Sequence, residues 1–136
     1  PEAEGVRMGA LASLNQREEV LRSLKSLRDA ATLVFGDPDS FTVEGADSTR
    51  GAFLPPLLLR AQDPYAPALH EVEAFGPVST VIGYRDLDDA IALAARGKGS
   101  LVGSLVTHDP AVARHVTIGI APYHGRVLVL DRDDAK

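Results

Sequence analysis

The chain has 136 residues, of which 45% are hydrophobic and 24% charged, and its formal net charge is −5. These values suit one ordinary soluble domain and exclude a disordered tail. Without a Lys/Arg cluster, a long apolar run or any cysteine, the chain offers no nucleic-acid surface, membrane span or disulfide framework. We therefore expect no nucleic-acid or membrane partner. We also expect a cytoplasmic protein, although a cysteine-free chain suits other compartments too.

The first predicted element is a helix over residues 15–30. Ser13 suits its N-cap, and Gln16, three residues later, completes a capping box. An apolar stripe at helical spacing follows, made of Val20, Leu21, Leu24 and Leu27. Residues 32–35 predict a short strand, and the turn formers of residues 37–50 predict a surface loop.

The next segments contain several prolines. Residues 53–60 predict an edge strand or a kinked strand, because Pro55 and Pro56 cannot donate hydrogen bonds to a ladder. Residues 63–69 predict an irregular segment that leads into residues 70–78.

From residue 78 onward, strands and helices alternate. The expected elements are, in chain order, a strand over residues 78–84, a helix over 87–96, a strand over 101–106, a helix from Pro110 to near Gly119 and a strand over 126–130. Asp86 and Asp109 suit the two helix N-caps. Short loops between these elements predict right-handed crossovers in a parallel sheet. The nearly continuous apolar strands are typical of strands covered on both faces, so bare faces or open edges would favour self-association.

Residues 70–78 carry the clearest functional signal. Glu73 and Phe75 are two apart, so they project to the same side of an extended segment, and a Gly-Pro turn follows. A carboxylate beside an aromatic ring suits a ribose attached to a flat ring, because the carboxylate can accept both hydroxyl protons. The alternative is an ordinary surface turn with a solvated Glu73 and a core Phe75.

Several segments together resemble the aldehyde dehydrogenase superfamily. Residues 73–78 match its Glu-x-Phe-Gly-Pro-Val pattern, residues 8–11 are similar to its Met-Gly-Pro-Leu segment, and residues 51–56 are similar to its Gly-x-Phe-x-x-Pro-Thr strand. Further matches in the expected order are Gln16, Val20, Ala90, Ile91, Gly103, Thr107 and Asp109. The resemblance covers essentially all 136 residues.

The resemblance implies an α/β fold, a three-layer sandwich fragment with a mostly parallel sheet that is part of the catalytic domain. It implies an NAD(P)-dependent enzyme, with Glu73 holding the nicotinamide ribose and Phe75 packing beside it. Residues 72–78, 99–101 and 124–126 look most like the dehydrogenase half of the bifunctional ring-opening enzymes of bacterial phenylacetate degradation. That branch implies a CoA-linked semialdehyde substrate and NADP. The alternative within the class is a dehydroadipyl-CoA semialdehyde enzyme.

The family's nucleophile is a cysteine, and this chain has none. The family's general-base glutamate and its Gly-rich dinucleotide turn belong to segments that precede the matched region. We therefore expect residues 1–136 to be part of the catalytic domain of a homo-oligomeric parent enzyme. These residues contain no catalytic residue and are expected to be inactive alone. A structural or oligomerisation module is the alternative for the isolated chain.

Three other groups of residues receive no chemical role. Residues 96–100 lack the spacing of a phosphate-binding loop and follow a helix, so they predict a helix end and a turn. Asp86, Asp88 and Asp89 fall in a first helical turn, where the helix dipole favours negative charge without a metal. The chain has four histidines: His70, His108, His115 and His124. None of them has the i, i+4 spacing of a helical metal pair, so we assign no metal site.

Overall fold

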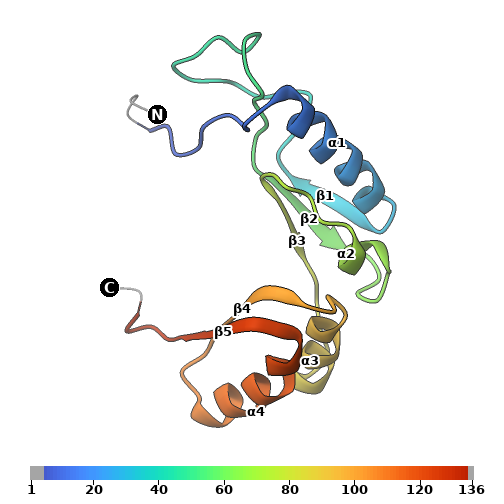
Figure 1. Ribbon diagram of the computed structural model, residues 1–136, viewed down its shortest axis with the longest axis vertical. Helices are drawn as coiled ribbons and strands as arrows, with labels where there is room; N and C mark the ends of the chain where they lie inside the picture. The colour runs from blue at the N-terminus through green and yellow to red at the C-terminus, as the bar shows by residue number, and fades with distance from the viewer. Residues whose placement is uncertain (1–4, 135–136) are drawn as a thin grey trace. The chain divides into compact units, whose positions relative to one another are not determined.

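The computed structural model describes residues 5–134, and the chain divides into two compact units, Pro1–Ile82 and Gly83–Lys136 (Figure 1). The first unit contains α1 (Leu14–Arg28), β1 (Ala31–Phe35), β2 (Leu57–Ala61), α2 (Ala68–Glu71) and β3 (Val78–Val81). The second contains α3 (Leu87–Ala95), β4 (Ser100–Val106), α4 (Pro110–Ile120), the 3-10 turn Ala121–Tyr123 and β5 (His124–Leu130).

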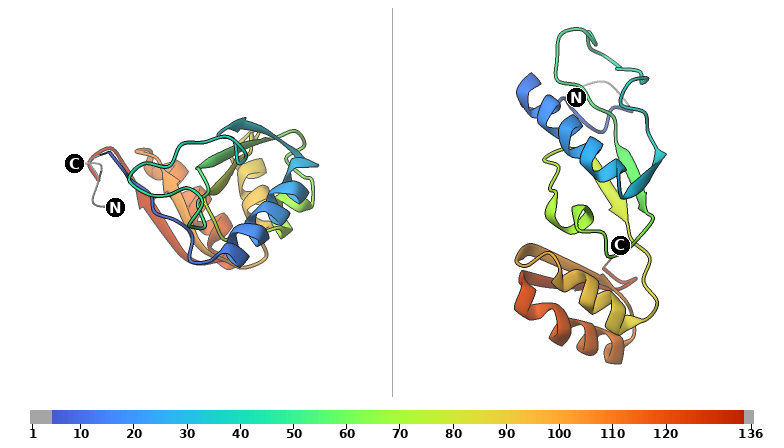
Figure 2. Two further views of the ribbon diagram at one scale, coloured as in Figure 1. Left: turned by 90° about the horizontal axis from the view of Figure 1, so that it is seen from above. Right: turned by 90° about the vertical axis from the view of Figure 1, so that its right-hand side faces the viewer.

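Helix α1 begins directly after the predicted N-cap, Ser13, although Oε1 of Gln16 accepts from the amide of Ala12 and not from the N-cap amide of a capping box. The Ser13 side chain accepts a hydrogen bond from the backbone amide of Gln16 at 3.1 Å. Helix α1 lies along one face of the three-stranded sheet (Figure 2), and its apolar stripe packs into one cluster with residues of the sheet. The buried core of this unit consists of Val20, Leu24, Leu27, Ala31, Leu54, Leu57 and Leu59. The loop predicted over residues 37–50 contains no helix or strand.

The sheet of the first unit has the order β1-β2-β3, with β1 antiparallel and β3 parallel to β2. The prediction of an edge strand over residues 53–60 is therefore wrong, since β2 is the central strand. The two prolines precede the strand, which begins at Leu57, so neither removes a ladder hydrogen bond. The short helix α2 begins within the segment predicted to be irregular, residues 63–69, and extends two residues beyond it. The sequence did not indicate this helix, because one turn is too short to give a helical periodicity.

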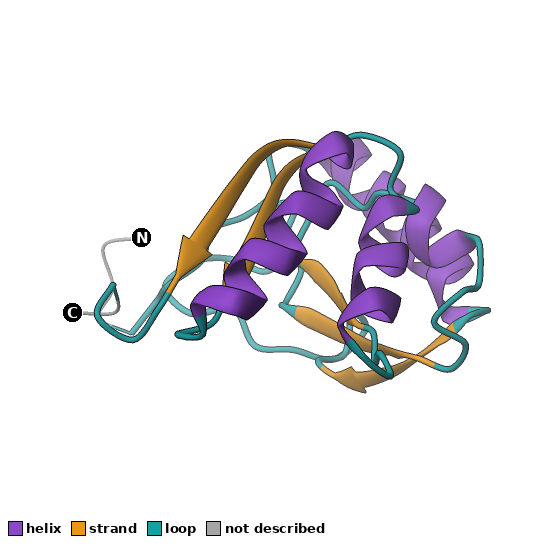
Figure 3. Ribbon diagram, turned by 90° about the horizontal axis from the view of Figure 1, so that it is seen from below, coloured by secondary structure: helices purple, strands orange, loops and turns teal. Residues whose placement is uncertain are grey.

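In the second unit, β4 and β5 form a two-stranded parallel sheet joined through α4. Figures 1 and 3 show α3 and α4 on the same face of these two strands. The predicted caps are confirmed, since Asp86 accepts from the amide of Asp89, and Asp109 accepts from the amides of Ala111 and Val112.

The α/β class with mostly parallel strands is confirmed, because both the β2–β3 and the β4–β5 pairings are parallel. The predicted strand over residues 78–84 is shorter, ending at Val81. Among the described residues, β3 pairs with β2 and not with β4 or β5, so the predicted single parallel sheet is divided between the two units. Strand β3 pairs through one edge, with β2, a partner from earlier in the chain.

One face of the β4–β5 sheet packs against α4. A side chain at Gly103 would come within 3.2 Å of Ile120, so position 103 faces that helix. Because strand residues alternate, Val102 and Val106 point to the opposite face, where they are 44% and 76% exposed. Within the described chain, helices therefore cover only one face of the sheet, although the apolar strand sequences predict cover on both faces.

Candidate functional site

The candidate site is the corner formed by residues 73–78, which joins α2 to β3. Two tight backbone turns shape it: the amide of Gly76 donates to the carbonyl of Ala74 at 2.7 Å, and that of Val78 donates to the carbonyl of Gly76 at 2.8 Å. The carbonyl of Pro77 accepts from the amide of Leu57 at 2.8 Å, which ties the corner to the start of β2. The corner is thus fixed by the backbone on the side of the sheet.

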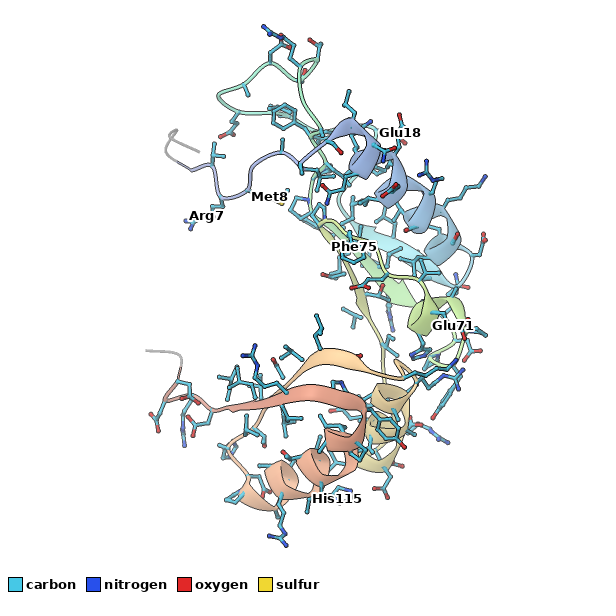
Figure 4. All side chains as sticks on the ribbon, viewed as in Figure 1. Arg7, Met8, Glu18, Glu71, Phe75 and His115 are labelled. Carbon is cyan, nitrogen blue, oxygen red and sulfur yellow. The ribbon has the colours of Figure 1, made fainter. Side chains whose placement is uncertain are left out.

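Side chains along this segment alternate between the core and the surface. Val72 and Ala74 pack against the buried cluster of the first unit, whereas Glu73 and Phe75 are exposed. Phe75 is 70% exposed and projects from the corner (Figure 4), so the alternative of a core phenylalanine is wrong. The corner therefore presents a carboxylate and an aromatic ring on its outer side, both accessible to a ligand.

Helix α1 holds the corner from the other side. The side-chain amide Nε2 of Gln16 donates to the carbonyl of Phe75 at 2.7 Å, and its Oε1 accepts from the amide of Ala12 at 2.9 Å. One turn later, Val20 lies against Gly76 so closely that an added Cβ at Gly76 would come within 2.7 Å of its Cγ2. Sequence analysis identified Gln16 as part of a capping box and as a match to the family pattern, and it assigned no contact with the corner. Its contact with the corner joins residues 59 positions apart, and no local pattern signals it.

A hollow of about 560 Å³ lies elsewhere in the first unit. It is lined mainly by apolar side chains of residues 5–9, 41–46 and 53–56. Neither Glu73 nor Phe75 lines it, so the hollow and the corner are separate features.

Three of the four histidines contact structural partners. Nε2 of His70 contacts the carbonyl of Pro64 at 2.7 Å, and Nδ1 of His124 contacts that of Ile120 at 3.0 Å. His115 forms a 2.8 Å pair with a carboxylate oxygen of Asp88. Within residues 5–134, no three or more His, Cys, Asp or Glu side chains converge as metal ligands would.

The acidic residues at the start of α3 form hydrogen bonds with groups of the protein. The buried carboxylate of Asp89 accepts from the backbone amide and from Nη2 of Arg85, both at 2.9 Å. Residues 96–100 form a turn between α3 and β4, with Lys98 at φ 56° and Gly99 at φ 141°, which confirms the predicted turn. No helix in the described part of the chain has the length and apolarity needed to span a membrane.

Comparisons with known proteins agree on one family. The profile of the aldehyde dehydrogenase family matches residues 1–127. The chain is 42% identical over 132 residues to a 3,4-dehydroadipyl-CoA semialdehyde dehydrogenase from Aromatoleum evansii, covering 96% of this chain and 26% of that protein. It is 42% identical over 127 residues to protein MaoC of Klebsiella aerogenes, covering 91% and 36% of the two chains. The chain thus spans between about a quarter and about a third of the length of these relatives.

Solved structures show the same relationship. A lactaldehyde dehydrogenase from Escherichia coli superposes with a TM-score of 0.75 at 26% identity, covering 94% of this chain and 25% of that one. A betaine aldehyde dehydrogenase from Staphylococcus aureus, solved in complex with NAD⁺, superposes with a TM-score of 0.77 at 25% identity and covers 95% and 25%. The chain belongs to the aldehyde dehydrogenase family.

Proposed function

We propose that residues 1–136 form part of the catalytic domain of an NAD(P)-dependent aldehyde dehydrogenase in the cytoplasm. In this proposal Glu73 and Phe75 hold the nicotinamide half of the cofactor. The observation that carries the proposal is the exposed carboxylate and ring on a corner fixed from both sides. Family membership and the NAD⁺ complex of the staphylococcal relative support it.

The two residues bind and orient, and they do not react. The Glu73 carboxylate accepts hydrogen bonds from both hydroxyls of the nicotinamide ribose, and charge assistance makes such bonds strong. Phe75 packs beside this ribose and limits its movement. When bound, the nicotinamide supplies a hydride acceptor, and its distance from the aldehyde carbon determines the rate steeply. The nucleophilic cysteine of the family is absent from these 136 residues, so the reacting group comes from elsewhere in the parent enzyme.

The proposed substrate of the parent enzyme is a CoA-linked semialdehyde, which is oxidised to the acid in phenylacetate or related aromatic catabolism. The name of the Aromatoleum relative, which is 42% identical to this chain, supports a CoA-linked semialdehyde and also supports dehydroadipyl-CoA semialdehyde as the alternative substrate. The test compares kcat/KM for the CoA-linked semialdehyde of phenylacetate catabolism with kcat/KM for dehydroadipyl-CoA semialdehyde. Each substrate is also compared with its analogue without CoA, and each is measured with NAD and with NADP. Equal efficiency with free aldehydes would contradict the CoA-linked substrate.

The test of the site is Glu73→Gln in the full-length protein that carries these residues. The substitution keeps the shape and removes the charge, so we expect single-turnover NAD(P)H formation to slow by roughly one to two orders of magnitude. The melting temperature should change little, because Glu73 is exposed. Phe75→Ala should act in the same direction.

Glu18→Gln is the matched control, because it removes one exposed charge from the outer surface of α1 (Figure 4). We expect it to retain the rate of the unmodified enzyme. Hydride transfer at the unmodified rate in Glu73→Gln would make Glu73 an ordinary surface carboxylate and would refute the proposed site.

A second proposal concerns the 136 residues alone, which we expect to be catalytically inactive because they contain no cysteine. A purified sample should form no NAD(P)H from any aldehyde above a control without protein. Turnover by this sample would refute the assignment of the nucleophile to the rest of the parent enzyme.

We also propose that the parent enzyme is a homo-oligomer and that the isolated chain self-associates. Leu101 and Val106 of β4 are 86% and 76% exposed, and both lie in a two-stranded sheet with open edges. Sedimentation velocity at increasing concentration should show oligomers. A single monomeric species at high micromolar concentration would contradict this proposal.

A further inference from the structure

We propose that Gln16 is a positioning residue that holds the corner of residues 73–78 in the conformation needed for cofactor binding. This inference rests on the proposed function of Glu73 and Phe75. Its basis is the 2.7 Å hydrogen bond from the side chain of Gln16 to the carbonyl of Phe75. Gln16 does not itself contact the reacting atoms in this proposal, and it acts through the peptide that joins Phe75 to Gly76.

Both ends of the Gln16 amide are engaged, so its orientation is fixed. Oε1 accepts from the amide of Ala12 just before α1, and Nε2 donates to the corner. The donor end therefore points at one carbonyl, held there by the acceptor end. A side chain with only one of these contacts would be free to rotate away.

A second contact from the same face of α1 supports the corner. Val20 is one helical turn after Gln16, so the two side chains lie on the same face. Val20 packs directly on Gly76, the residue that follows the carbonyl bound by Gln16. The helix thus holds two consecutive residues of the corner, one by a hydrogen bond and one by close packing.

The bound carbonyl belongs to the residue whose ring is 70% exposed. The Phe75 side chain has little packing of its own, so its position depends on the backbone that carries it. Fixing the Phe75–Gly76 peptide fixes the origin of the ring and, two residues earlier, that of the Glu73 carboxylate. Small displacements of such groups reduce hydride transfer strongly, because the reaction depends on the approach geometry.

The competing explanation is that Gln16 only caps α1, and two substitutions separate the two roles. Gln16→Glu retains an oxygen that can accept from Ala12 but has no N–H for the carbonyl of Phe75. Ser13→Ala removes the N-cap hydrogen bond to the amide of Gln16 and leaves the corner contact untouched. Gln16→Met keeps the length of the side chain and removes both hydrogen bonds.

The experiment measures single-turnover NAD(P)H formation in the full-length protein, with deuterated aldehyde to identify the hydride step, alongside the melting temperature. We expect Gln16→Glu and Gln16→Met each to slow the hydride step by about threefold to tenfold, the scale of one lost hydrogen bond. The KM of the aldehyde should not change. Ser13→Ala should lower the melting temperature at least as much while keeping the hydride rate.

Unchanged hydride rates in both Gln16 variants would overturn the inference, as would an equal slowing in Ser13→Ala. Glu73→Gln, measured in parallel, separates this failure from that of the proposed function. If Glu73→Gln slows hydride transfer and the Gln16 variants do not, only the inference about Gln16 falls. If Glu73→Gln has no effect, the proposed site falls and the role of Gln16 falls with it.

Discussion

The two units of the chain differ in how completely they bury their apolar residues. In the first unit, a helix and a three-stranded sheet enclose seven buried core residues, and Leu59 of the central strand is 0% exposed. In the second unit, the buried apolar residues are Leu93, Val116 and Ile120, all on helices. Its strands leave Leu101 and Val106 largely exposed.

The difference follows from the sheets. Strand β2 has a partner on each side and α1 above it, so its residues Leu57 and Leu59 are buried. Within residues 5–134, strands β4 and β5 pair only with each other, and a two-stranded sheet is marginal without further cover. The candidate site therefore lies on the unit with the more complete core, and the second unit offers surfaces for additional protein.

The largest expected effect is a loss of stability from Leu59→Ala. Removing a fully buried leucine side chain should lower the free energy of unfolding by about 2–5 kcal/mol. Leu101→Ala is the matched control, and it should change this free energy by less than about 0.5 kcal/mol, because Leu101 is 86% exposed. Urea denaturation of the two variants measures both values. Equal losses would show that the second unit has a core as complete as the first.

A somewhat smaller effect is expected from Gly76→Ala. An added Cβ would meet Val20 Cγ2 at 2.7 Å, so the corner or the helix must move, at a cost of about 1–3 kcal/mol. Gly83→Ala is the control, since no atom lies within 4 Å of the Cβ it would add. Thermal denaturation compares the variants. Equal melting temperatures would mean that the corner is not seated on α1.

In the second unit, the corresponding test is Asp89→Asn. The Asp89 side chain is 3% exposed and accepts two hydrogen bonds from Arg85, so loss of its charge should cost about 1–3 kcal/mol. Asp88→Asn changes a side chain that is 85% exposed and should cost less than about 1 kcal/mol. Hydrogen exchange of the amides of α3 reports the effect locally. An unperturbed α3 in Asp89→Asn would show that this unit is organised by its apolar contacts alone.

The two units were also unequally predictable from the sequence. In the second unit, Asp86 and Asp109 gave correct helix starts, because capping is a local interaction. In the first unit, Pro55 and Pro56 pointed to an edge strand, yet β2 is central. Whether the prolines fall inside or before the strand depends on where the hydrogen-bond ladder begins. Strands distant in sequence determine that starting point.

One part of the candidate site was also predictable from the sequence and another part was not. The outward projection of Glu73 and Phe75 follows from the two-residue period of an extended segment, and the structure places both on the surface. Their support from Gln16 and Val20 depends on tertiary packing of α1 over the corner. A capping-box pattern reports only contacts within the first helical turn, so it could not reveal that support.

The smallest expected effect concerns the loop of residues 37–50, where side chains accept hydrogen bonds from residues two positions away. Both the hydroxyl and the amide of Thr49 donate to Asp47, at 2.7 and 2.9 Å, and they lower the pKa of Asp47 below its ordinary value of 3.8. Because the folded-state pKa is lowered, any stabilisation from this carboxylate is present above pH 3.8. It is lost as the pH falls through the folded-state pKa.

Thr49→Ala removes the hydroxyl donor, so the pKa of Asp47 should rise toward 3.8, as followed by an NMR titration of its side-chain carboxyl. Ser48→Ala, in the same loop, should leave this titration unchanged. The melting temperature should be the same in both variants, because Asp47 is fully exposed and separate from the buried cluster around Leu59. A Thr49→Ala variant that also destabilised the core would show that the loop supports the first unit, and the contrast between a closed core and its local surface loop would then be lost.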